Sequence, residues 1–247
     1  MDNKFIFDLD DTLILTEYHY TKAKDEAIHY FIHLLNGKAP GIDYIIEKME
    51  QFDRKVMKEM PLSPYSIKRF PNSLIETMQF LCDKEHVKYT KKNIKEIEKI
   101  GSIAFECPCT DLLPNAKKTL DFLLYKKDEL VLLTKGDTEH QMKKVISNGI
   151  DHWFNDRITV VQGDKSPEIV LSLVGGHDKN RSYCVGNYYR SDIEPALGAG
   201  IKGIYIPKGT WRHELVENSA EKAKETGRVV VLDDIILIKK EYGILFK

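Results

Sequence analysis

The stretch FIFDLDDTL, at residues 5–13, constrains the fold of this chain more than any other feature. A short apolar run with a large aromatic share is typical of a buried parallel strand. Because side chains alternate along a strand, Asp8 and Asp10 project to the same side where this strand ends. In an open α/β sheet, ligands bind at that end of the strands. Two carboxylates held side by side repel each other unless a proton or a cation lies between them, so the pattern predicts a hard divalent ion, most readily Mg²⁺.

From residue 111 onward, apolar strands alternate with amphipathic helices. The predicted strands cover residues 129–134, 157–161, 182–186, 203–206 and 228–232. One predicted helix covers residues 115–127. A second begins after Asp137, a third begins at Pro167, and a fourth ends near residues 198–200. Such alternation predicts a parallel sheet wound by right-handed crossovers. The expected fold class is therefore α/β, with a Rossmann-like, three-layer α/β/α core.

Residues 16–106 have a different texture. Apolar residues recur at steps of three and four in four stretches, at residues 20–34, 42–60, 74–81 and 90–104. Proline ends the second stretch, and residues 71–73 precede the third. No convincing strand lies between these stretches. We expect an all-helical domain of residues 16–106, inserted into a core made of residues 1–15 and 107–247.

Composition limits the classes of function. The chain has 247 residues, with 37 Lys and Arg against 38 Asp and Glu, so no strong field directs it toward nucleic acid or a membrane surface. Its four cysteines lack the second pair of a zinc finger, which favours buried or surface thiols. No apolar run reaches membrane-spanning length, and the first predicted strand begins too early to leave room for a signal peptide. We expect a reduced, soluble, cytoplasmic protein.

Polar residues at the predicted strand ends carry a resemblance to a known family. Residues 8–12, DLDDT, resemble the first motif, D-x-D-x-[TV], of the haloacid dehalogenase superfamily. The second motif of that superfamily resembles the apolar strand that ends in Thr134, which Lys135 and Gly136 follow. Lys165, just before a predicted helix, resembles the third motif. Each motif alone is a weak signal, but their order along the chain agrees with the superfamily.

The fourth motif is the most specific of the set. Residues 185–192, VGNYYRSD, resemble its G-D-x-x-x-x-D form, after an apolar strand and before a helix of small residues. Asn187 stands where aspartate is more common. An amide oxygen can still ligate Mg²⁺, but it contributes no charge. Asp192 is therefore the stronger candidate for the charged ligand, with Asn187 binding directly or through water.

The resemblance implies a reaction on phosphate esters. Asp8 is expected to attack phosphorus and form an aspartyl-phosphate, while Asp10 acts as general acid and then as general base. The implied Mg²⁺ ligands are Asp8, the backbone carbonyl of Asp10, Asn187 and Asp192. A less favourable ligand at Asn187 would lower metal affinity and turnover.

The same resemblance implies how the phosphoryl group is held. Thr134 and Gly136 are expected to position its oxygens, and Lys165 to offset its negative charge. The further candidates for binding phosphate or the rest of the substrate are Thr12, Lys135 and Arg190. Lys135 departs from the asparagine often found in this superfamily, which leaves its role open. The helical insert resembles the C1-type cap, which closes over the site and selects the substrate.

These implied roles predict a Mg²⁺-dependent phosphomonoester hydrolase for a small phosphorylated metabolite, such as a sugar phosphate or a nucleotide. A phosphomutase shares all four motifs and stays open, as does a catalytically weak binding or regulatory relative, which Asn187 motivates. Asp10 argues against a 2-haloacid dehalogenase, and the lack of membrane helices argues against an ion pump. The expected partner is a small phosphorylated molecule, with no nucleic acid and no membrane, and the chain is expected to be a monomer or a homodimer.

Substrate selection is the part that the sequence determines least. Candidate selectors are Arg54, Lys55, Lys68, Arg69 and Phe70 in the insert, Arg190 in the fourth motif, and Trp211, Arg212 and His213 after the fifth strand. Residues of these types are more often ordinary surface or packing residues, so the sequence favours none of them.

Overall fold

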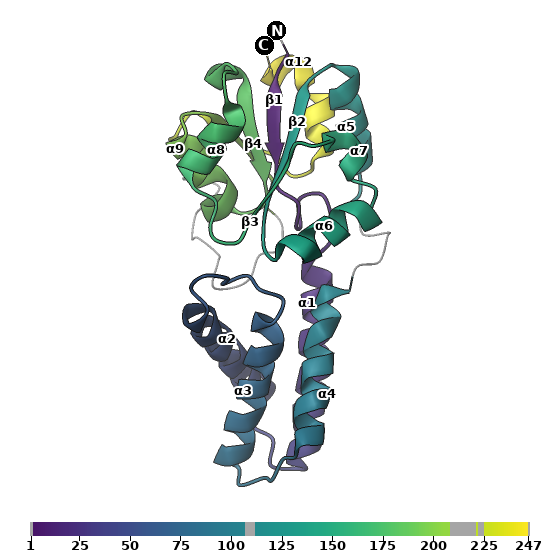
Figure 1. Ribbon diagram of the computed structural model, residues 1–247, viewed down its shortest axis with the longest axis vertical. Helices are drawn as coiled ribbons and strands as arrows, with labels where there is room; N and C mark the ends of the chain where they lie inside the picture. Colours follow the sequence, from purple (N-terminus) through teal and green to yellow (C-terminus); the bar gives the residue numbers. More distant parts are fainter. Residues whose placement is uncertain (1, 107–111, 208–220, 222–224, 247) are drawn as a thin grey trace.

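A parallel β-sheet organises the upper part of the molecule in Figure 1. The computed structural model describes residues 2–106, 112–207, 221 and 225–246. Among these residues the strands are β1 (Lys4–Phe7), β2 (Glu129–Lys135), β3 (Ile158–Val161), β4 (Ser182–Gly186), β5 (Lys202–Tyr205) and β6 (Val229–Val231). They lie in the order β3-β2-β1-β4-β5-β6, and every neighbouring pair is parallel. This strand order is that of a Rossmann-like sheet.

The direction of winding reverses beside β1. The chain runs outward from β1 to β2 and β3, and then crosses back to β4 on the other side of β1. Phe7 pairs with Leu132 of β2 and with Val185 of β4. The Asp8 amide then donates a hydrogen bond to the Val185 carbonyl at 2.9 Å. Because ligands bind outside the carboxyl ends of strands at such a reversal, Asp8 lies where a ligand is expected.

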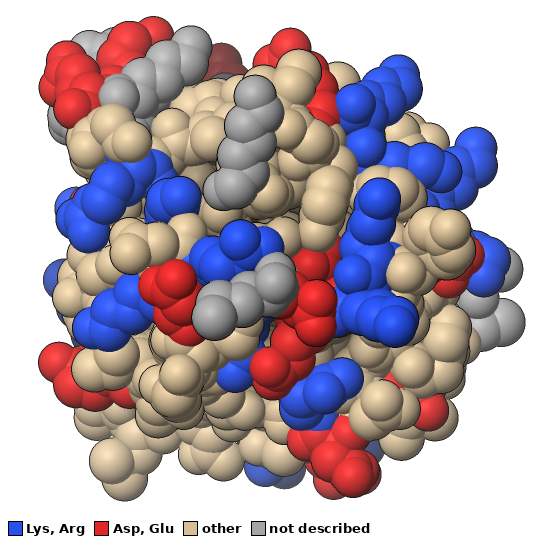
Figure 2. Space-filling model, turned by 90° about the horizontal axis from the view of Figure 1, so that it is seen from above, with Lys and Arg blue, Asp and Glu red and all other residues tan. Residues whose placement is uncertain are grey.

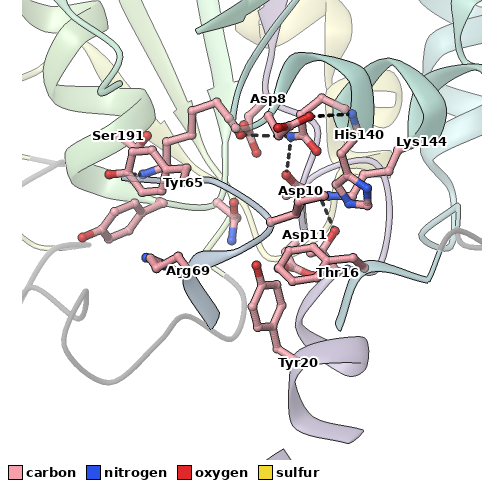
Figure 3. Close-up of a pocket in the computed structure, with 18 of the residues that line it drawn as sticks. Asp8, Asp10, Asp11, Thr16, Tyr20, Tyr65, Arg69, His140, Lys144 and Ser191 are labelled. Atoms are coloured by element: carbon pink, nitrogen blue, oxygen red, sulfur yellow. Dashed lines mark hydrogen bonds and ion pairs between the residues drawn. The ribbon is translucent and has the colours of Figure 1, made fainter. Parts of the chain in front are cut away.

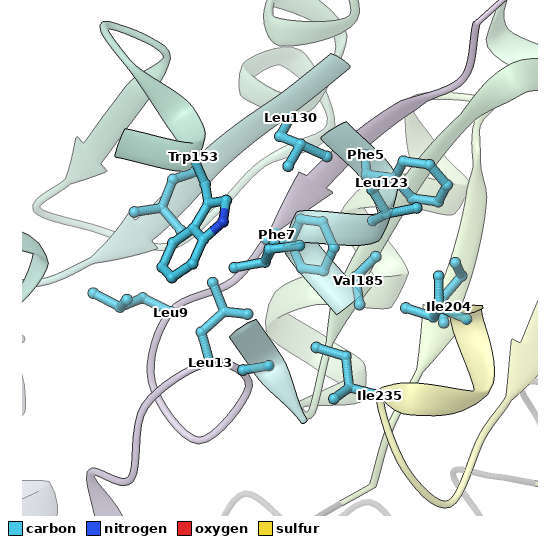
Figure 4. Close-up of a cluster of buried hydrophobic side chains, with 14 of the residues drawn as sticks. Phe5, Phe7, Leu9, Leu13, Leu123, Leu130, Trp153, Val185, Ile204 and Ile235 are labelled. Carbon is cyan, nitrogen blue, oxygen red and sulfur yellow. The ribbon is translucent and has the colours of Figure 1, made fainter. Parts of the chain in front are cut away.

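Alternation along β1 supplies both faces of the sheet. Phe5 and Phe7 are fully buried on one face, in the cluster with Trp153 that Figure 4 shows. The helices that contribute to this face include α5 (Ala116–Tyr125), α7 (Asp151–Phe154), α11 (Ile236–Lys240) and α12 (Tyr242–Leu245). Ile6 packs on the opposite face with α8 (Pro167–Val174) and α9 (Glu194–Gly198). The predicted three-layer α/β/α core is therefore confirmed.

The long helices below the sheet in Figure 1 come from one continuous stretch of chain. They are α1 (Glu17–Leu35), α2 (Ile42–Glu59), α3 (Arg69–Lys84) and α4 (Lys91–Ser102), followed by the 3₁₀ turn η1 (Ile103–Phe105). None of residues 16–106, all of which the structure describes, lies in one of the strands of the sheet. The helices share a core of their own around Phe31, Leu74 and Met78, which are buried away from the sheet. The helical character predicted for the insert is confirmed.

The element boundaries depart from the predicted ones in a few places. Helix α3 begins at Arg69 rather than after residues 71–73, because Pro71 lies in the first turn, where a missing N–H costs nothing. Helix α6 (Thr138–Ser147) begins as predicted, with the Asp137 side chain accepting a hydrogen bond from the His140 amide. Elements absent from the prediction are α7, α11, α12, the 3₁₀ turn η2 (Lys179–Arg181) and the π-helix η3 (Tyr189–Ile193).

The surface carries charges of both signs. Figure 2 shows the end of the molecule that bears the two termini, where blue and red side chains are interspersed. This mixture agrees with the near balance of 37 Lys and Arg against 38 Asp and Glu in the chain. In the described part of the chain, no helix has both the length and the apolar character that a membrane crossing requires.

Candidate active site

The third carboxylate of the first motif, Asp11, holds the turn between β1 and α1. Asp11 has a φ of 58°, a left-handed conformation that aspartate tolerates better than most residues. Its Oδ1 accepts hydrogen bonds from the backbone amides of Thr16 at 2.8 Å and Glu17 at 2.9 Å. Burial raises the pKa of Asp11 to about 6. Asp11 thus stabilises the start of the helical segment, next to the site.

Asp8 lies directly after β1 and is 8% exposed. Lys165 Nζ lies 2.6 Å from Asp8 Oδ1 and 2.7 Å from Asp192 Oδ1. Burial raises the pKa of Asp8 to about 7; Lys165 opposes this rise, while Asp192 and Asp10 add to it. Burial would lower the pKa of Lys165, but Asp192 and Asp8 raise it above its ordinary value. The lysine therefore stays charged between two carboxylates.

Asp10 is held by a different set of partners, which come from α6 and from the start of α1. Lys144 Nζ lies 2.6 Å from Asp10 Oδ1, and Gln141 Nε2 donates to Asp10 Oδ2 at 2.8 Å. Thr16 Oγ1 donates to Asp10 Oδ1 at 2.5 Å. Burial would raise the pKa of Asp10, but Lys144, Thr16 and Gln141 hold it below its ordinary value. The two carboxylates predicted to work together thus have pKa values moved in opposite directions.

Thr12 connects the first and fourth motifs. Its hydroxyl lies 3.0 Å from Asp8 Oδ2 and 3.2 Å from Asn187 Oδ1, and it accepts a hydrogen bond from the Asn187 amide at 3.1 Å. Thr12 is 4% exposed, so it is buried behind these two side chains. It orients Asp8 and Asn187 and does not itself line the pocket.

The fourth motif is shaped by a π-helix. The segment η3 begins after Tyr188, whose amide donates to Asp192 Oδ2 at 2.9 Å. Gly186 precedes it, and a Cβ at that position would collide with the Asp192 carboxylate. Only glycine therefore lets the carboxylate lie against the end of β4. The extra residue of a π-turn is common at functional sites, and here it directs both Ser191 and Asp192 toward Asp8.

The second motif ends β2 with two engaged polar groups. Thr134 Oγ1 is fully buried and accepts a hydrogen bond from Gln141 Nε2 at 2.6 Å. The Gly136 amide donates to the Val161 carbonyl at 2.8 Å. Gly136 has a φ of 144°, and a Cβ there would press on the Gln141 side chain. Thr134 and Gly136 thus shape the floor of the site around Gln141.

A cavity of about 140 Å³ opens in front of Asp8 and Asp10. Figure 3 shows Asp10 and Lys144 on one side of it and Tyr65 and Arg69 on the other. Its wall toward the helical segment contains Tyr20, Tyr65, Ile67, Arg69 and Phe105. Two walls from different parts of the chain therefore enclose one pocket.

Comparison with curated proteins finds a phosphatase among the relatives of the chain. Over 133 residues the chain is 32% identical to a glyceraldehyde 3-phosphate phosphatase from Methanothermobacter thermautotrophicus. That match covers 51% of this chain and 57% of the relative, so the chain spans little more than half the length of the relative that it matches. No protein-family model matches the chain.

Comparison with solved structures covers almost the whole chain. A haloacid dehalogenase-like family hydrolase from Xanthomonas campestris has a TM-score of 0.72 at 23% identity, over 99% of this chain and 92% of that one. A candidate HAD hydrolase from Bacillus subtilis, bound to magnesium, has a TM-score of 0.57 at 14% identity, over 99% and 98% of the two chains. At such low identities the likeness shows the fold.

This chain has the haloacid dehalogenase fold. The resemblance predicted from the four motifs is thereby confirmed at the level of the fold, and so is the α/β core with a helical insertion. The comparisons do not test the roles of the individual site residues, which stay predictions.

Within this haloacid dehalogenase fold, most of the predicted site residues come together. Asp8, Asp10, Lys135, Gly136, Asn187 and Asp192 line one pocket, with Thr12, Thr134 and Lys165 directly behind them. Arg190 does not join them, since it is exposed and absent from the pocket lining.

Of the candidate selectors in the helical segment, Arg69 lines the pocket, whereas Arg54, Lys55 and Lys68 are exposed and Phe70 is buried. Trp211, Arg212, His213 and the thiols of Cys107 and Cys109 lie outside the described residues, while Cys82 and Cys184 are free and buried.

Sequence reasoning missed the polar face of α6. Gln141 is 2% exposed and Lys144 is 8% exposed, yet both contact Asp10. Their spacing of three residues puts them on one helix face, beside the fully buried Val145. A glutamine and a lysine on an otherwise apolar face were the signal that could have found them. Tyr65 left no such signal, because it lies in the connection between α2 and α3.

The donor chemistry of the pocket fits a hard divalent cation. Ser191 Oγ is buried in the pocket wall and has no hydrogen-bond partner among the described residues. Among the described residues, the lining contains the aspartates Asp8, Asp10, Asp11, Asp137 and Asp192 against the cations Arg69, Lys135 and Lys144. Burial and Lys144 lower the pKa of His140 to about 4, so this histidine adds no charge. Among the described residues no three His, Cys, Asp or Glu side chains group around one point.

Proposed function

We propose that this chain is a Mg²⁺-dependent hydrolase of small phosphomonoesters and acts through an aspartyl-phosphate on Asp8. The observation that carries the proposal is the arrangement of Asp8, which lies buried at the carboxyl end of the central strand. Lys165 contacts it at 2.6 Å, and the acid–base candidate Asp10 lies two residues away in the chain. A nucleophile, a neutralising cation and an acid–base group are the parts that phosphoryl transfer through an enzyme carboxylate requires.

In the first step, an Asp8 carboxylate oxygen attacks phosphorus and the bond from phosphorus to the ester oxygen breaks. Asp10 gives its proton to the departing oxygen. Lys144 holds the pKa of Asp10 low, so Asp10 must gain a proton when the substrate binds. The negative charge of an incoming phosphate favours this, since a like charge disfavours an ionised carboxylate nearby. Lys165 offsets the charge that collects around Asp8.

In the second step, Asp10 accepts a proton from water, whose oxygen attacks the phosphorus of the aspartyl-phosphate. The bond from phosphorus to the Asp8 oxygen breaks, which restores the Asp8 carboxylate and releases inorganic phosphate. The contacts of Asp10 with Lys144, Gln141 and Thr16 keep its carboxylate in one orientation for this role. The low pKa of Asp10 favours the ionised form that a general base needs.

Asp8, Asn187 and Asp192, with the backbone carbonyl of Asp10, would hold the Mg²⁺ ion. When bound, the ion supplies Lewis-acid polarisation of a phosphoryl oxygen and offsets the excess of aspartates in the lining. Ser191 Oγ is available as a further oxygen at the same place. Support for the choice of metal comes from the magnesium-bound neighbour of the same fold.

The size of the pocket favours a substrate with few atoms beyond the phosphate. A cavity of about 140 Å³ is small beside the roughly 300–1,000 Å³ of pockets for drug-sized ligands. A nucleotide is therefore less suited than a short sugar or acid phosphate. The curated relative is named for glyceraldehyde 3-phosphate, a three-carbon ester. We propose residues 16–106 as the cap that closes this pocket and excludes water during the first step.

Hydrolysis of para-nitrophenyl phosphate tests the proposal. The assay compares the wild-type chain with Mg²⁺, the wild-type chain with EDTA, and Asp8→Asn with Mg²⁺. We expect turnover only in the first condition, and circular dichroism should show that Asp8→Asn keeps its fold. Turnover by Asp8→Asn would contradict the role of Asp8, and equal turnover in EDTA would contradict the metal. No turnover on this or any other phosphomonoester, with Mg²⁺ bound, would point to the non-catalytic relative.

A further inference from the structure

We propose that Lys135, positioned by Tyr65, binds a carboxylate on the part of the substrate that leaves, so that the preferred substrates are phosphomonoesters that carry an acid group. This inference rests on the proposed function and names the substrate class of the same site.

Lys135 differs from the other cations of the pocket in its ion pairing. Lys144 is paired with Asp10 at 2.6 Å, and Arg69 lies 3.4 Å from Asp53. Lys165, behind the pocket, is paired with two carboxylates. Lys135, by contrast, forms no ion pair with any residue that the structure describes. Among the cations of the described lining, it is the one that makes no direct ion pair with a carboxylate, although Tyr65 links it through its hydroxyl to Asp164.

Aromatic rings hold the Lys135 ammonium in place. Its Nζ lies 4.3 Å from the centre of the Tyr65 ring and 5.5 Å from that of the Tyr188 ring. It also donates a hydrogen bond to the Tyr65 hydroxyl at 3.3 Å. Ring faces attract an ammonium without neutralising it. Lys135 is therefore positioned in advance and still able to pair with an anion.

Tyr65 brings this contact to the boundary between the two walls of the pocket. It comes from the connection between α2 and α3, and its hydroxyl donates to Asp164 Oδ1 at 2.5 Å. Figure 3 shows Tyr65 on the Arg69 side of the pocket, away from Lys144 and His140. A substrate whose phosphate lies at Asp8 would extend the rest of its atoms toward this wall.

The aspartates of the lining make an unpaired cation necessary for an acidic substrate. Without a positive partner, a second negative group would be repelled by Asp137 and the other carboxylates of the lining. A carboxylate matches the single charge of Lys135, and the cavity of about 140 Å³ leaves little room for a second phosphate. A phosphate ester of a short hydroxy acid has both properties.

Binding of two matched probes tests the inference without requiring turnover. The probes are 3-phosphoglycerate and glycerol 3-phosphate, which share a carbon skeleton and differ in a carboxylate against a hydroxymethyl group. Calorimetry with Asp8→Asn protein and Mg²⁺ gives the ratio of their Kd values. We expect tighter binding of 3-phosphoglycerate, and we expect Lys135→Met to reduce that preference roughly 10- to 100-fold, as for loss of a charged hydrogen bond.

Two further variants control the comparison. Lys135→Arg keeps the charge and should keep most of the preference. Lys92→Met removes a lysine that is exposed on α4, far from the pocket lining, and should leave both affinities unchanged. An equal loss of affinity for both probes in Lys135→Met would overturn the inference, because Lys135 would then serve the shared phosphate. A preference for glycerol 3-phosphate in the parent protein would overturn it as well.

Turnover separates this inference from the function on which it rests. Discrimination that depends on Lys135, in a wild-type chain that hydrolyses neither the two probes nor para-nitrophenyl phosphate or any other phosphomonoester, would support the acid-binding site and overturn the phosphatase proposal alone. Hydrolysis of both probes with a ratio of kcat/KM unaffected by Lys135→Met would overturn the acid-binding site alone.

Discussion

The two walls of the pocket are built in different ways. The wall from the sheet consists of buried charged groups in short contact, with Lys165 and Lys144 each 2.6 Å from an aspartate oxygen. The wall from the helical segment consists mainly of aromatic side chains, among them Tyr20, Tyr65 and Phe105. Its cation, Arg69, has its charge balanced by Asp53, 3.4 Å away within the same segment.

This difference suits the two walls to different roles in the proposed reaction. Buried ion pairs hold their atoms in place, because removal of one partner leaves a charge uncompensated. The groups that react therefore belong on the sheet wall, where their positions are fixed. Aromatic contacts tolerate changes of shape, so the helical wall is suited to select the substrate. Substitutions of the reacting groups and their partners in the sheet wall should lower kcat, and those in the helical wall should raise KM.

The largest effect is expected at Lys144, which lies at the sheet wall but contacts Asp10 from α6. Lys144→Met removes the charge that holds Asp10 ionised and oriented. We expect kcat for para-nitrophenyl phosphate to fall about 100-fold, within the range of general acid–base contributions. Because Lys144 lowers the pKa of Asp10, the pH dependence of kcat should shift toward higher pH in the variant.

Lys143→Met is the matched control for Lys144. Lys143 is the preceding residue on α6, is exposed, and does not line the pocket. Its substitution should leave both kcat and the pH dependence unchanged. An unchanged pH dependence in Lys144→Met, despite a fall in kcat, would mean that Lys144 supports the fold of α6 and not Asp10.

A smaller effect is expected in the helical wall, at Arg69. Arg69→Lys keeps the charge that pairs with Asp53 but loses the planar guanidinium. We expect KM to rise about tenfold and kcat to stay within about twofold, since uniform binding is lost. Arg54→Lys, on the exposed side of α2, is the control and should change neither constant. A fall in kcat with constant KM would place Arg69 among the reacting groups and break the division between the walls.

The same division explains how much of the site could be predicted from the sequence. Asp8, Thr134 and Asp192 follow apolar strands, and parallel strands bring their carboxyl ends to one edge of the sheet. Their meeting was therefore predictable from a local pattern. Gln141 and Lys144 were not, because the rotation of α6 about its axis depends on packing against the sheet, which the sequence pattern only partly encodes.

The helical wall was even less predictable. The helices themselves have clear apolar periodicity, but the path of the connection that carries Tyr65 depends on how α2 packs on α3 and on contacts with Asp164, 99 residues away in the chain. Pro71 was read as a boundary, although the first turn of α3 accommodates it. Long-range contacts of a loop have no signature in a single sequence.

Asn187 tests the sheet wall with a gain in place of a loss. Asn187→Asp adds a charge to the proposed Mg²⁺ ligands, next to Thr12 and Asp8. We expect the Kd for Mg²⁺ to fall roughly fivefold, about 1 kcal/mol, because carboxylates bind the ion more strongly than amides. Calorimetric titration measures it directly. An unchanged Kd would place Asn187 outside the metal shell and leave its role to the hydrogen bonds with Thr12.

The smallest effect concerns the stability of the sheet wall without metal. Burial, Asp192 and Asp10 raise the pKa of Asp8 to about 7 against the opposing effect of Lys165. Between its ordinary value and pH 7, the folded chain therefore binds a proton at Asp8 that the unfolded chain does not bind. Stability from this group is present at low pH and is lost as the pH rises through about 7. The Asp8→Asn side chain cannot ionise, so the variant does not lose this stability as the pH rises.

In EDTA, we therefore expect Asp8→Asn to melt at nearly the same temperature as the wild-type chain at pH 5 and about 2–4 °C higher at pH 8, which for a chain of this size corresponds to about 1 kcal/mol. The gain stays small because the variant also gives up the charged contact with Lys165. Asp25→Asn, at an exposed position of α1, should show no difference between the two pH values. Added Mg²⁺ should reverse the order at pH 8, since the ionised Asp8 then gains a cation. If the wild-type chain melts higher than Asp8→Asn at pH 8 in EDTA, Lys165 alone compensates the buried carboxylates, and the sheet wall is complete without a metal.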